Sequence, residues 1–553
     1  MIIFLSTTQY CKLVKIDIFI KTDYSIRVVV MKKLLRKLFN RTTLVIFILL
    51  IELAAIVAVF YVGALFEETG TLGKKYPDLT WISLIDNLAL LVLLIMQIII
   101  FFRILYRQMD AEFKIPWIII LLVLPFFGSL IYIIFARRNL KKKDARLLNA
   151  SDGLGAKFFL EGADVSHMDE FHKTFDYLDN NSILCAHLHN RVTYYKNGET
   201  FFPELIKELE QAKEFIFLEF FIIGDGKEWQ KVRKILVEKA AQGVDVRVVY
   251  DDLGSAGVLK GNEKQKLRKL GIKAYKYNKF KPFISGVYNN RDHRKIAVID
   301  HRAGFTGGMN LADEYANIDS PFGYWKDTMI KVEGSAINNL IQLFLTNYDL
   351  CAHKTSNHAA FLDYEYPKFD EPGVVYPFGH GPAPYFKERV GEETLINIIN
   401  SARKTLYISS PYFIPSESLL YSIRRAALNG VEVYLFLPGV PDKKLVYHVA
   451  ETYFKTLMKA GVHIMTYRPG FNHMKTLLAD GKLAFVGTIN CDYRSLVHHF
   501  ECGVVLYNNP CCKDIEEDFK AMMVESDEVP QLFEMSKFII FICALIKPFV
   551  SLM

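Results

Sequence analysis

The sequence contains little cysteine, and none of it is spaced for metal binding. Eight cysteines occur in 553 residues, without a Cys-x-x-Cys motif, and the only close pair is Cys511 and Cys512. Zinc sites and disulfide frameworks both require regularly spaced cysteines. We therefore expect reduced, mostly buried thiols, with neither a zinc framework nor a disulfide ladder.

We also expect no cleavable secretion signal at the start of the chain. Residues 1–30 are mixed in character and lack an ordered series of basic, apolar and cleavage regions. Met31 then opens a basic stretch that is typical of the beginning of a membrane protein. Residues 1–30 are thus either an upstream start artefact or a genuine short amphiphilic extension.

Basic residues are only moderately in excess of acidic residues. Hydrophobic residues make up 51% and charged residues 23% of the chain, which fits neither a pure bundle of membrane spans nor a typical soluble enzyme. The net charge of +7 suits an anionic partner, and both nucleic acid and an acidic lipid surface qualify. Charge alone does not choose between them.

Long apolar runs are present near the N-terminus, at residues 44–65, 84–105 and 116–135. Each is close to the roughly 20 residues that a membrane span requires. The runs predict a multi-pass membrane segment over residues 31–140. Basic clusters flank both ends of this segment, so the side of the catalytic domain is not fixed, although a cytoplasmic location is favoured. Residues 536–553 are apolar but too short to span, and predict an interfacial or packed tail.

An internal repeat organises the rest of the chain. Short apolar runs alternate with amphipathic stretches, which indicates α/β layers with a mixed sheet. The segment at 242–246 returns at 429–433, and the strand-like segment at 216–222 returns at 406–414. We therefore predict two α/β lobes. The first covers residues 141–375 and the second residues 376–530.

Each predicted lobe carries the same polar pattern, H-x-K-x4-D. The members are offset by 180 residues, and an asparagine follows each aspartate by ten positions. The two sets are His293, Lys295, Asp300 and Asn310, and His473, Lys475, Asp480 and Asn490. Two such patterns with coinciding flanks are not expected by chance.

These residue types suit chemistry on a phosphodiester. Histidine and lysine two positions apart on a strand project from the same face. A hindered, anionic phosphorus requires a nucleophile, proton transfer and cations over its oxygens. The doubled pattern supplies all three, and the two asparagines can add neutral donors. No metal and no other cofactor is then needed.

The paired patterns resemble the HKD motifs of the phospholipase D superfamily, and their flanks are similar to those of bacterial cardiolipin synthases. The flanks are residues 290–295, 307–310, 410–413 and 487–495, and residues 81–143 resemble the membrane leader of that family. The run at 44–65 is additional to the two segments typical of many relatives.

The resemblance implies two repeated lobes that form one shared active site. One histidine attacks phosphorus to give a phosphohistidine, and the other acts as acid and base. Carried over, His293 is the nucleophile and His473 the acid and base, although the near-symmetry of the site does not fix this allocation. Glu501 and Asp327 match the carboxylates that orient the histidines. Asp300 and Asp480 belong to the catalytic motifs, with a role that is chiefly structural.

The resemblance also implies the substrates. Phosphatidylglycerol serves as donor and acceptor, cardiolipin and glycerol are the products, and the partner is an anionic membrane surface of a bacterial cell rather than nucleic acid. Three alternatives stay open: a hydrolytic phospholipase D, an endonuclease on the same fold, and an inactive membrane scaffold. The oligomeric state is left open.

Several further polar residues have simpler interpretations. Single histidines are most often solvated or satisfied in the core, which we take to be the case for His187, His189, His498 and His499. Glu219 is a strand carboxylate that either faces the cleft or lies at a strand edge.

Overall fold

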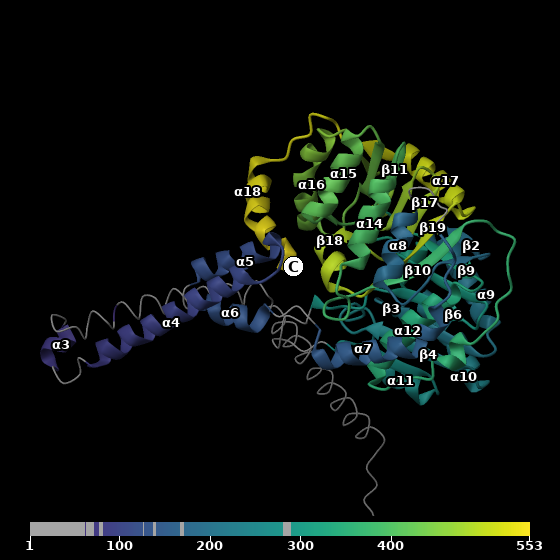
Figure 1. Ribbon diagram of the computed structural model, residues 1–553, viewed down its shortest axis with the longest axis horizontal. Helices are drawn as coiled ribbons and strands as arrows, with labels where there is room; N and C mark the ends of the chain where they lie inside the picture. The colour runs from purple at the N-terminus through teal and green to yellow at the C-terminus, as the bar shows by residue number, and fades with distance from the viewer. Residues whose placement is uncertain are drawn as a thin grey trace, which may run out of the picture. The chain divides into compact units, whose positions relative to one another are not determined.

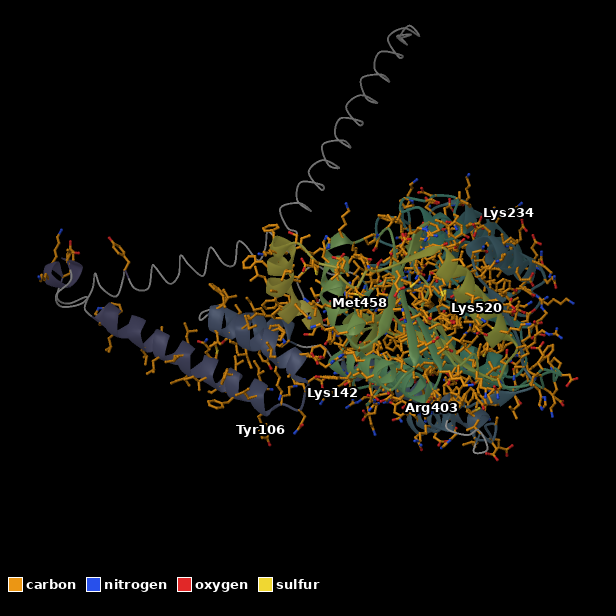
Figure 2. All side chains as sticks on the ribbon, turned by 90° about the horizontal axis from the view of Figure 1, so that it is seen from above. Tyr106, Lys142, Lys234, Arg403, Met458 and Lys520 are labelled. Atoms are coloured by element: carbon orange, nitrogen blue, oxygen red, sulfur yellow. The ribbon has the colours of Figure 1, made fainter. Side chains whose placement is uncertain are left out.

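The computed structural model describes residues 61, 71–76, 81–124, 127–136, 140–165, 171–279 and 289–552. The chain divides into two compact units, residues 1–136 and residues 137–553. Figure 1 draws the helices and strands of both units. Figure 2 adds the side chains, with Lys234 and Lys520 at the surface of the second unit.

The described part of the first unit is helical. It contains α3 (Thr71–Lys75), α4 (Trp81–Tyr106), α5 (Ala111–Val123) and α6 (Gly128–Phe135). The rings of Trp117 and Tyr132 meet edge to face at 5.3 Å, so α5 and α6 pack on each other. Gly128 allows this approach, because a Cβ there would lie 2.8 Å from the carbonyl oxygen of Ile120.

The three predicted spans have different outcomes. The run at 84–105 lies within α4, whereas the run at 116–135 is not the single helix that we expected, because it is divided between α5 and α6. The run at 44–65 lies outside the described residues except for Tyr61. Among the helices that the structure describes, none combines the length and apolarity needed to cross a bilayer.

The second unit contains two large mixed sheets. The first has seven strands, and β3, β4 and β5 run parallel while the others are antiparallel. Its spatial order is β2 (Arg191–Tyr195), β9 (Met329–Glu333), β7 (Ala303–Gly307), β6 (Lys295–Ile299), β3 (Phe215–Phe220), β4 (Asp245–Asp251) and β5 (Lys273–Tyr277).

The second sheet repeats this order and adds a strand at each edge. Its order is β1 (His187–Leu188), β10 (Val374–His380), β19 (Glu501–Tyr507), β17 (Leu483–Gly487), β16 (Thr476–Ala479), β11 (Thr405–Ser409), β13 (Glu432–Pro438), β14 (Val462–Tyr467) and β20 (Ser526–Glu528). The seven strands from β10 to β14 match those from β2 to β5 in order and direction, so the predicted α/β repeat with mixed sheets is confirmed.

The described part of the second unit also contains helices. They are α7 (Lys142–Gly155), α8 (His172–Asn181), α9 (Gly198–Glu210), α10 (Lys227–Ala241), α11 (Glu263–Lys269), α12 (Ile337–Ala352), α13 (Ala359–Leu362), α14 (Val390–Ser401), α15 (Glu417–Leu428), α16 (Lys444–Met458), α17 (Cys511–Val524) and α18 (Lys537–Ile546). Helix α12 contacts β3, β5, β6 and β7 of the first sheet and β10 of the second. Its residues from Ile337 to Leu350 are all buried, which makes it a central core element.

The lobes are joined where their sheets meet. Strands β17 and β19 of the second sheet contact β7 of the first, and β15 (Gly470–Asn472) pairs in parallel with β8 (Tyr324–Lys326). The predicted lobe boundary at 375 falls inside β10, and β1 pairs with β10 although it precedes the first sheet in sequence. The lobes therefore exchange segments instead of dividing at one point.

The apolar C-terminal tail is mostly helical. Helix α18 is followed by a 3₁₀ segment, η7 (Lys547–Leu552), and the side chains of Phe538, Phe541 and Leu545 are exposed. Ser551 is buried, and its carbonyl oxygen lies 3.3 Å from Nε2 of His498. The tail is thus anchored at its end and apolar on its outer face.

Candidate active site

The two motif histidines lie just before equivalent strands, His293 before β6 and His473 before β16. Each is fixed by a backbone bond to the other lobe. The amide of His293 donates to the carbonyl of Phe500 at 2.9 Å, and the amide of His473 donates to the carbonyl of Lys326 at 2.7 Å. Phe500 precedes Glu501, and Lys326 precedes Asp327. The same backbone pairing therefore brings each histidine to a carboxylate.

The side chains follow this crossed arrangement. Nδ1 of His293 lies 2.9 Å from Oε2 of Glu501, and Nδ1 of His473 lies 2.6 Å from Oδ2 of Asp327. A carboxylate that accepts the Nδ1 proton fixes the tautomer in which Nε2 carries the lone pair. The structure thus brings together the four residues that the sequence predicts as histidines and their orienting carboxylates.

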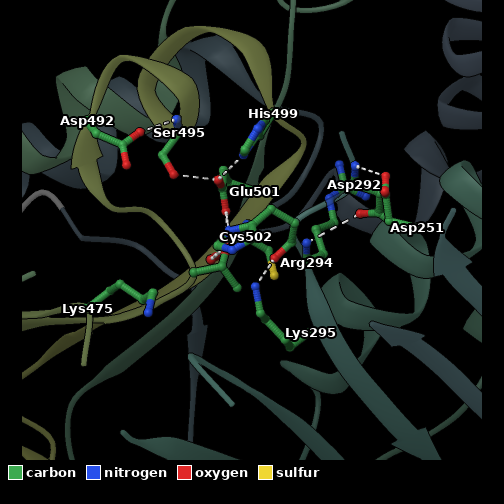
Figure 3. A network of polar contacts seen from close by, with 12 residues as sticks. Asp251, Asp292, Arg294, Lys295, Lys475, Asp492, Ser495, His499, Glu501 and Cys502 are labelled. Carbon is green, nitrogen blue, oxygen red and sulfur yellow. Dashed lines mark hydrogen bonds and ion pairs between the residues drawn. The ribbon is translucent and has the colours of Figure 1, made fainter. Parts of the chain in front are cut away.

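Glu501 is held by more donors than its histidine partner alone. The Thr488 hydroxyl donates to Oε2 at 2.5 Å and the Ser495 hydroxyl to Oε1 at 2.7 Å, while Nδ1 of His499 lies 3.4 Å from Oε1. Figure 3 shows Ser495 reaching Glu501 from the left and His499 reaching it from above. Although burial raises the pKa of Glu501, the interactions with His293 and His499 outweigh it and hold this pKa well below its usual range.

Asp327 has a poorer set of donors. Besides His473, its carboxylate accepts the amide of Thr328 at 2.8 Å. Burial is the largest influence and raises the pKa of Asp327 to about 6, against the opposing effects of Lys475, the Thr328 amide and Lys295. The two half-sites are therefore similar in geometry but differ in the proton affinity of their carboxylates.

Burial keeps the histidines neutral in the free protein. It lowers the pKa of His293 to about 3 and the pKa of His473 well below its usual range, and nearby lysines add to the effect on His473. The two rings are less than one-tenth exposed. A neutral imidazole with an available Nε2 lone pair can act as a nucleophile or as a base.

The motif lysines are buried beside the histidines. Nζ of Lys295 donates to the carbonyl of His293 at 2.5 Å, and Nζ of Lys475 donates to the carbonyl of His473. Burial lowers the pKa of Lys295 to about 8 and that of Lys475 to about 7. Both lysines can place positive charge at an anionic substrate, and this charge is lost in alkaline solution.

The two motif asparagines are not equivalent. Asn310 accepts the amide of Ile222 at 2.9 Å and donates to the Tyr315 hydroxyl at 2.7 Å, so most of its amide group serves the fold. Asn490 is also buried, but its Oδ1 atom has no hydrogen-bond partner among the described residues. Asn490 is thus the more available of the two for a ligand.

The motif aspartates lie apart from the histidines, at the far ends of β6 and β16. Asp300 accepts the amides of three successive residues, 213–215, at 2.9 Å each. Asp480 does the same for residues 403–405 at 2.7–2.9 Å. Both aspartates have a positive φ, 51° and 52°. Their carboxylates hold the starts of β3 and β11 and do not join the histidine cluster, although the sequence pattern places them in the catalytic motifs.

Sequence reasoning missed His499, Thr488 and Ser495. The expectation that His499 is solvated or satisfied in the core does not describe its place, because its ring lies 5.5 Å from the His293 ring. Thr488 and Ser495 lie inside a segment that resembles the family, but nothing in their spacing shows that they reach Glu501. In contrast, His187 is satisfied by Ser335 and Asn339.

One group in the described residues has the composition of a metal site. Donor atoms of His293, His499 and Glu501 lie within 4.8 Å of one another. However, the Glu501 oxygens already accept the Thr488 and Ser495 hydroxyls, and the charge of Lys295 acts on His293. A cation here would have to displace these donors and oppose a neighbouring positive charge, so the group fits an anionic substrate better than a metal.

Two repeated α/β lobes with one crossed histidine–lysine centre define a protein of the phospholipase D-like class. Residues 205–337 and 395–523 match the family described as cardiolipin synthase, PLD-like domain, and residues 95–137 match the phospholipase D-nuclease N-terminal family. The chain belongs to the phospholipase D-like cardiolipin synthase family.

Individual relatives agree with this assignment. The chain is 34% identical to a cardiolipin synthase of Geobacillus over 75% of this chain and 83% of the relative. It is 38% identical to an uncharacterized protein of Streptococcus mutans over 76% of this chain and 92% of that protein. The crystal structure of a phosphatidylserine synthase from Haemophilus influenzae shares the fold, with a TM-score of 0.52 at 15% identity, over 69% of this chain and 97% of that one.

Proposed function

We propose that this chain is a cardiolipin synthase that transfers a phosphatidyl group from one phosphatidylglycerol to another, giving cardiolipin and glycerol. The observation that carries the proposal is the crossed pair of histidine–carboxylate contacts, at 2.9 and 2.6 Å, beside two buried lysines. Membership of the cardiolipin synthase family supports a phosphatidyltransferase, and the family supplies the lipid substrates.

In the first step, Nε2 of His293 attacks phosphorus and the bond from phosphorus to the glycerol headgroup oxygen breaks. His473 gives a proton to that oxygen, and glycerol leaves. In the second step, His473 takes the proton from a hydroxyl of the second phosphatidylglycerol, whose oxygen attacks the phosphohistidine. Cardiolipin is released and His293 is restored. Lys295, Lys475 and the amide of Asn490 stabilise the charged phosphoryl oxygens.

The difference between the carboxylates supports this allocation of roles. Glu501 stays ionised and fixed, which suits a partner for the cationic imidazole of a phosphohistidine. His473 must hold a proton in the first step, although burial and the charges of Lys475, Lys295 and Lys443 lower its pKa in the free protein. A bound phosphodiester anion offsets the charge of these lysines and raises the proton affinity of His473. Asp327, with a pKa of about 6, then stabilises the protonated ring.

The other predicted site residues receive supporting roles. We assign Asp300 and Asp480 to holding strand starts, and Asn310 to fixing the backbone at Ile222, on the contacts described above. We place the enzyme at the bacterial cell membrane, with residues 31–140 and the apolar tail at 536–553 keeping the site near the headgroups of an anionic surface.

The proposal is tested by reconstituting the full chain with phosphatidylglycerol, without added metal, and analysing the lipids and released glycerol. Equimolar cardiolipin and glycerol support it. Phosphatidic acid without cardiolipin indicates a hydrolase, and cleavage of DNA with no lipid product indicates a nuclease. If none of these substrates changes, the inactive membrane scaffold is the remaining interpretation. The double variant His293→Ala, His473→Ala is the matched control and should form no product.

A further inference from the structure

The two half-sites have equivalent backbones but different charges behind their histidines. In the strand registers, Glu219 pairs with Ile296 and Ser409 pairs with Thr476, which are equivalent positions of β6 and β16. In the repeat, Asp292 of the first lobe is equivalent to Asn472 of the second, and Arg294 is equivalent to Met474. Three ionisable side chains in the first lobe thus stand where the second lobe has neutral ones.

In the first lobe, the carboxylates of Glu219 and Asp292 meet at Asn347 of α12. Nδ2 of Asn347 donates to Oε1 of Glu219 at 2.8 Å and to Oδ2 of Asp292 at 2.9 Å. The other oxygen of Asp292 accepts the amide of Arg294 at 3.3 Å. Asn347, Glu219, Asp292 and Arg294 are all at most 1% exposed, so water does not screen these contacts.

The second lobe has neutral side chains at the equivalent positions. Nδ2 of Asn472 donates to the Ser409 hydroxyl at 2.9 Å, and its Oδ1 accepts the amide of Met474 at 3.2 Å. This second contact reproduces the one between Asp292 and Arg294. The fold itself therefore does not require a buried acid pair, which is costly to place away from water.

The acid pair of Glu219 and Asp292 lies next to the backbone segment that carries His293. Asp292 forms a parallel bridge with Phe500, the Phe500 amide donates to the carbonyl of Arg291 at 2.8 Å, and the His293 amide donates to Phe500. A shift of Asp292 therefore moves His293 relative to Glu501, which follows Phe500. In Figure 3, Asp292 lies to the right of Glu501.

We propose that Asp292 is a positioning residue for His293, locked in place by the bridge that Asn347 makes to Glu219. The inference rests on the proposed function, because it assigns this network to the half-site of the nucleophile. The network acts through the backbone at Asp292 and His293 and does not touch the substrate.

The protonation of the acid pair agrees with a locked arrangement. Oε2 of Glu219 has no hydrogen-bond partner among the described residues. Burial and the neighbouring Glu219 raise the pKa of Asp292 well above its usual range, and burial also raises the pKa of Glu219. One proton shared between the two carboxyl groups satisfies the orphaned oxygen and leaves a single negative charge beside the Arg294 guanidinium, whose Nη1 lies 3.9 Å from Glu219.

The test replaces Asp292 with the residue found in the second lobe. In Asp292→Asn, an amide group faces the amide of Asn347, two donors oppose each other, and the segment shifts. We expect the rate of covalent labelling of His293 by phosphatidylglycerol carrying radioactive phosphorus to fall about tenfold to a hundredfold, with KM changed by less than about twofold. The swapped variant Asp292→Asn, Asn347→Asp restores a donor–acceptor pair and one shared proton, and should recover to within about threefold of wild type.

A matched control separates positioning from general loss of stability. Asn339 is buried on the same helix and donates to the carbonyls of Cys185 and Pro377, and the histidine that it contacts is His187, not a motif histidine. Asn347→Ala should slow labelling per folded molecule, whereas Asn339→Ala should lower only the unfolding temperature. The inference would be overturned if Asp292→Asn were labelled at the wild-type rate. It would also be overturned if the swapped variant folded but did not recover the labelling rate. Labelling does not depend on the acceptor, so a wild type that labels but forms no cardiolipin contradicts the proposed function alone.

Discussion

Nδ1 of His473 lies 2.6 Å from Oδ2 of Asp327, a residue of the other lobe. The reciprocal contact, between His293 and Glu501, is 2.9 Å. Neither lobe therefore contains a complete histidine–carboxylate pair, and the two lobes must be assembled before either histidine is oriented. This crossing explains why a duplicated sequence yields a single shared centre.

The first prediction concerns the carboxylates. In Glu501→Gln or Asp327→Asn, the amide can present a donor to Nδ1 and favour the wrong imidazole tautomer. We expect kcat to fall by about 10²- to 10⁴-fold in each variant. Glu501→Gln should also abolish covalent labelling of His293. A Glu501→Gln protein that labels at the wild-type rate would contradict the assigned pairing.

The second prediction separates the two histidines by the leaving group. His293→Ala should form no covalent intermediate with any donor. His473→Ala should be slow with phosphatidylglycerol, because glyceroxide leaves poorly without a proton. A donor with p-nitrophenol as leaving group needs no general acid, so His473→Ala should release p-nitrophenol at within about tenfold of the wild-type rate. The reverse pattern, with His293→Ala rescued, would exchange the two roles.

The third prediction is a bell-shaped dependence of kcat/KM on pH. Asp327 accepts the Nδ1 proton of His473 only when ionised, so activity should fall as the pH drops through about 6. Lys475 and Lys295 lose their charge as the pH rises through about 7 and about 8, so activity should fall on that side too.

Replacing one lysine tests the alkaline limb. Lys475→Arg keeps its charge at all accessible pH values, so its kcat should be lower but its alkaline limb should begin about one unit higher, where Lys295 alone titrates. An unchanged alkaline limb would show that another group controls it.

The sequence predicts the repeat well because its signals are local. The strand-like segments at 216–222 and 406–414 overlap β3 and β11. The spacing of His293 and Lys295 predicts that both side chains share one face, although β6 begins only at Lys295. The shared face follows from the two-residue period of a strand. Both features depend only on neighbours in sequence, which is why they were accessible.

Contacts between residues that neither a motif nor a period links were not accessible. The hydrogen bond from Ser495 to Glu501, the place of His499 beside His293 and the exchange of β1 into the second sheet join residues that no period or spacing connects. The division of the run at 116–135 was missed because apolarity gives the length of a segment but not its turns. Gly128 marks the close approach only once α5 and α6 are seen together.

The fourth prediction concerns the motif aspartates, whose carboxylates each accept three backbone amides. Asp300→Ala or Asp480→Ala removes the acceptor of three backbone amides, which lie at exposed or half-buried positions, and the loss of three hydrogen bonds should lower the free energy of unfolding by about 2–4 kcal/mol. Activity per folded molecule should change by less than about threefold. Denaturant unfolding measures the first quantity, and titration of labelled His293 gives the folded, active fraction for the second.

Asparagine provides the control for the aspartates. It tolerates the positive φ of about 50° at both positions and keeps one acceptor oxygen, so Asp300→Asn should lose roughly half of the stability that Asp300→Ala loses. A large fall in activity per folded molecule, with unfolding unchanged, would instead place these carboxylates in the chemistry.

The fifth prediction uses a difference between equivalent positions, Gly308 and Thr488. A Cβ at Gly308 would lie 2.0 Å from Oδ1 of Asp327, whereas the Thr488 hydroxyl donates to Glu501. Gly308→Ala must push the Asp327 carboxylate aside, so we expect kcat to fall by about tenfold or more because His473 loses its orientation.

Thr488→Val keeps the shape of the side chain but removes one donor from Glu501. Its effect should be smaller, about threefold to tenfold, and should appear in the labelling step of His293. Stopped-flow labelling and steady-state turnover of both variants separate the two half-sites, and a Gly308→Ala enzyme with normal turnover would mean that Asp327 does not orient His473.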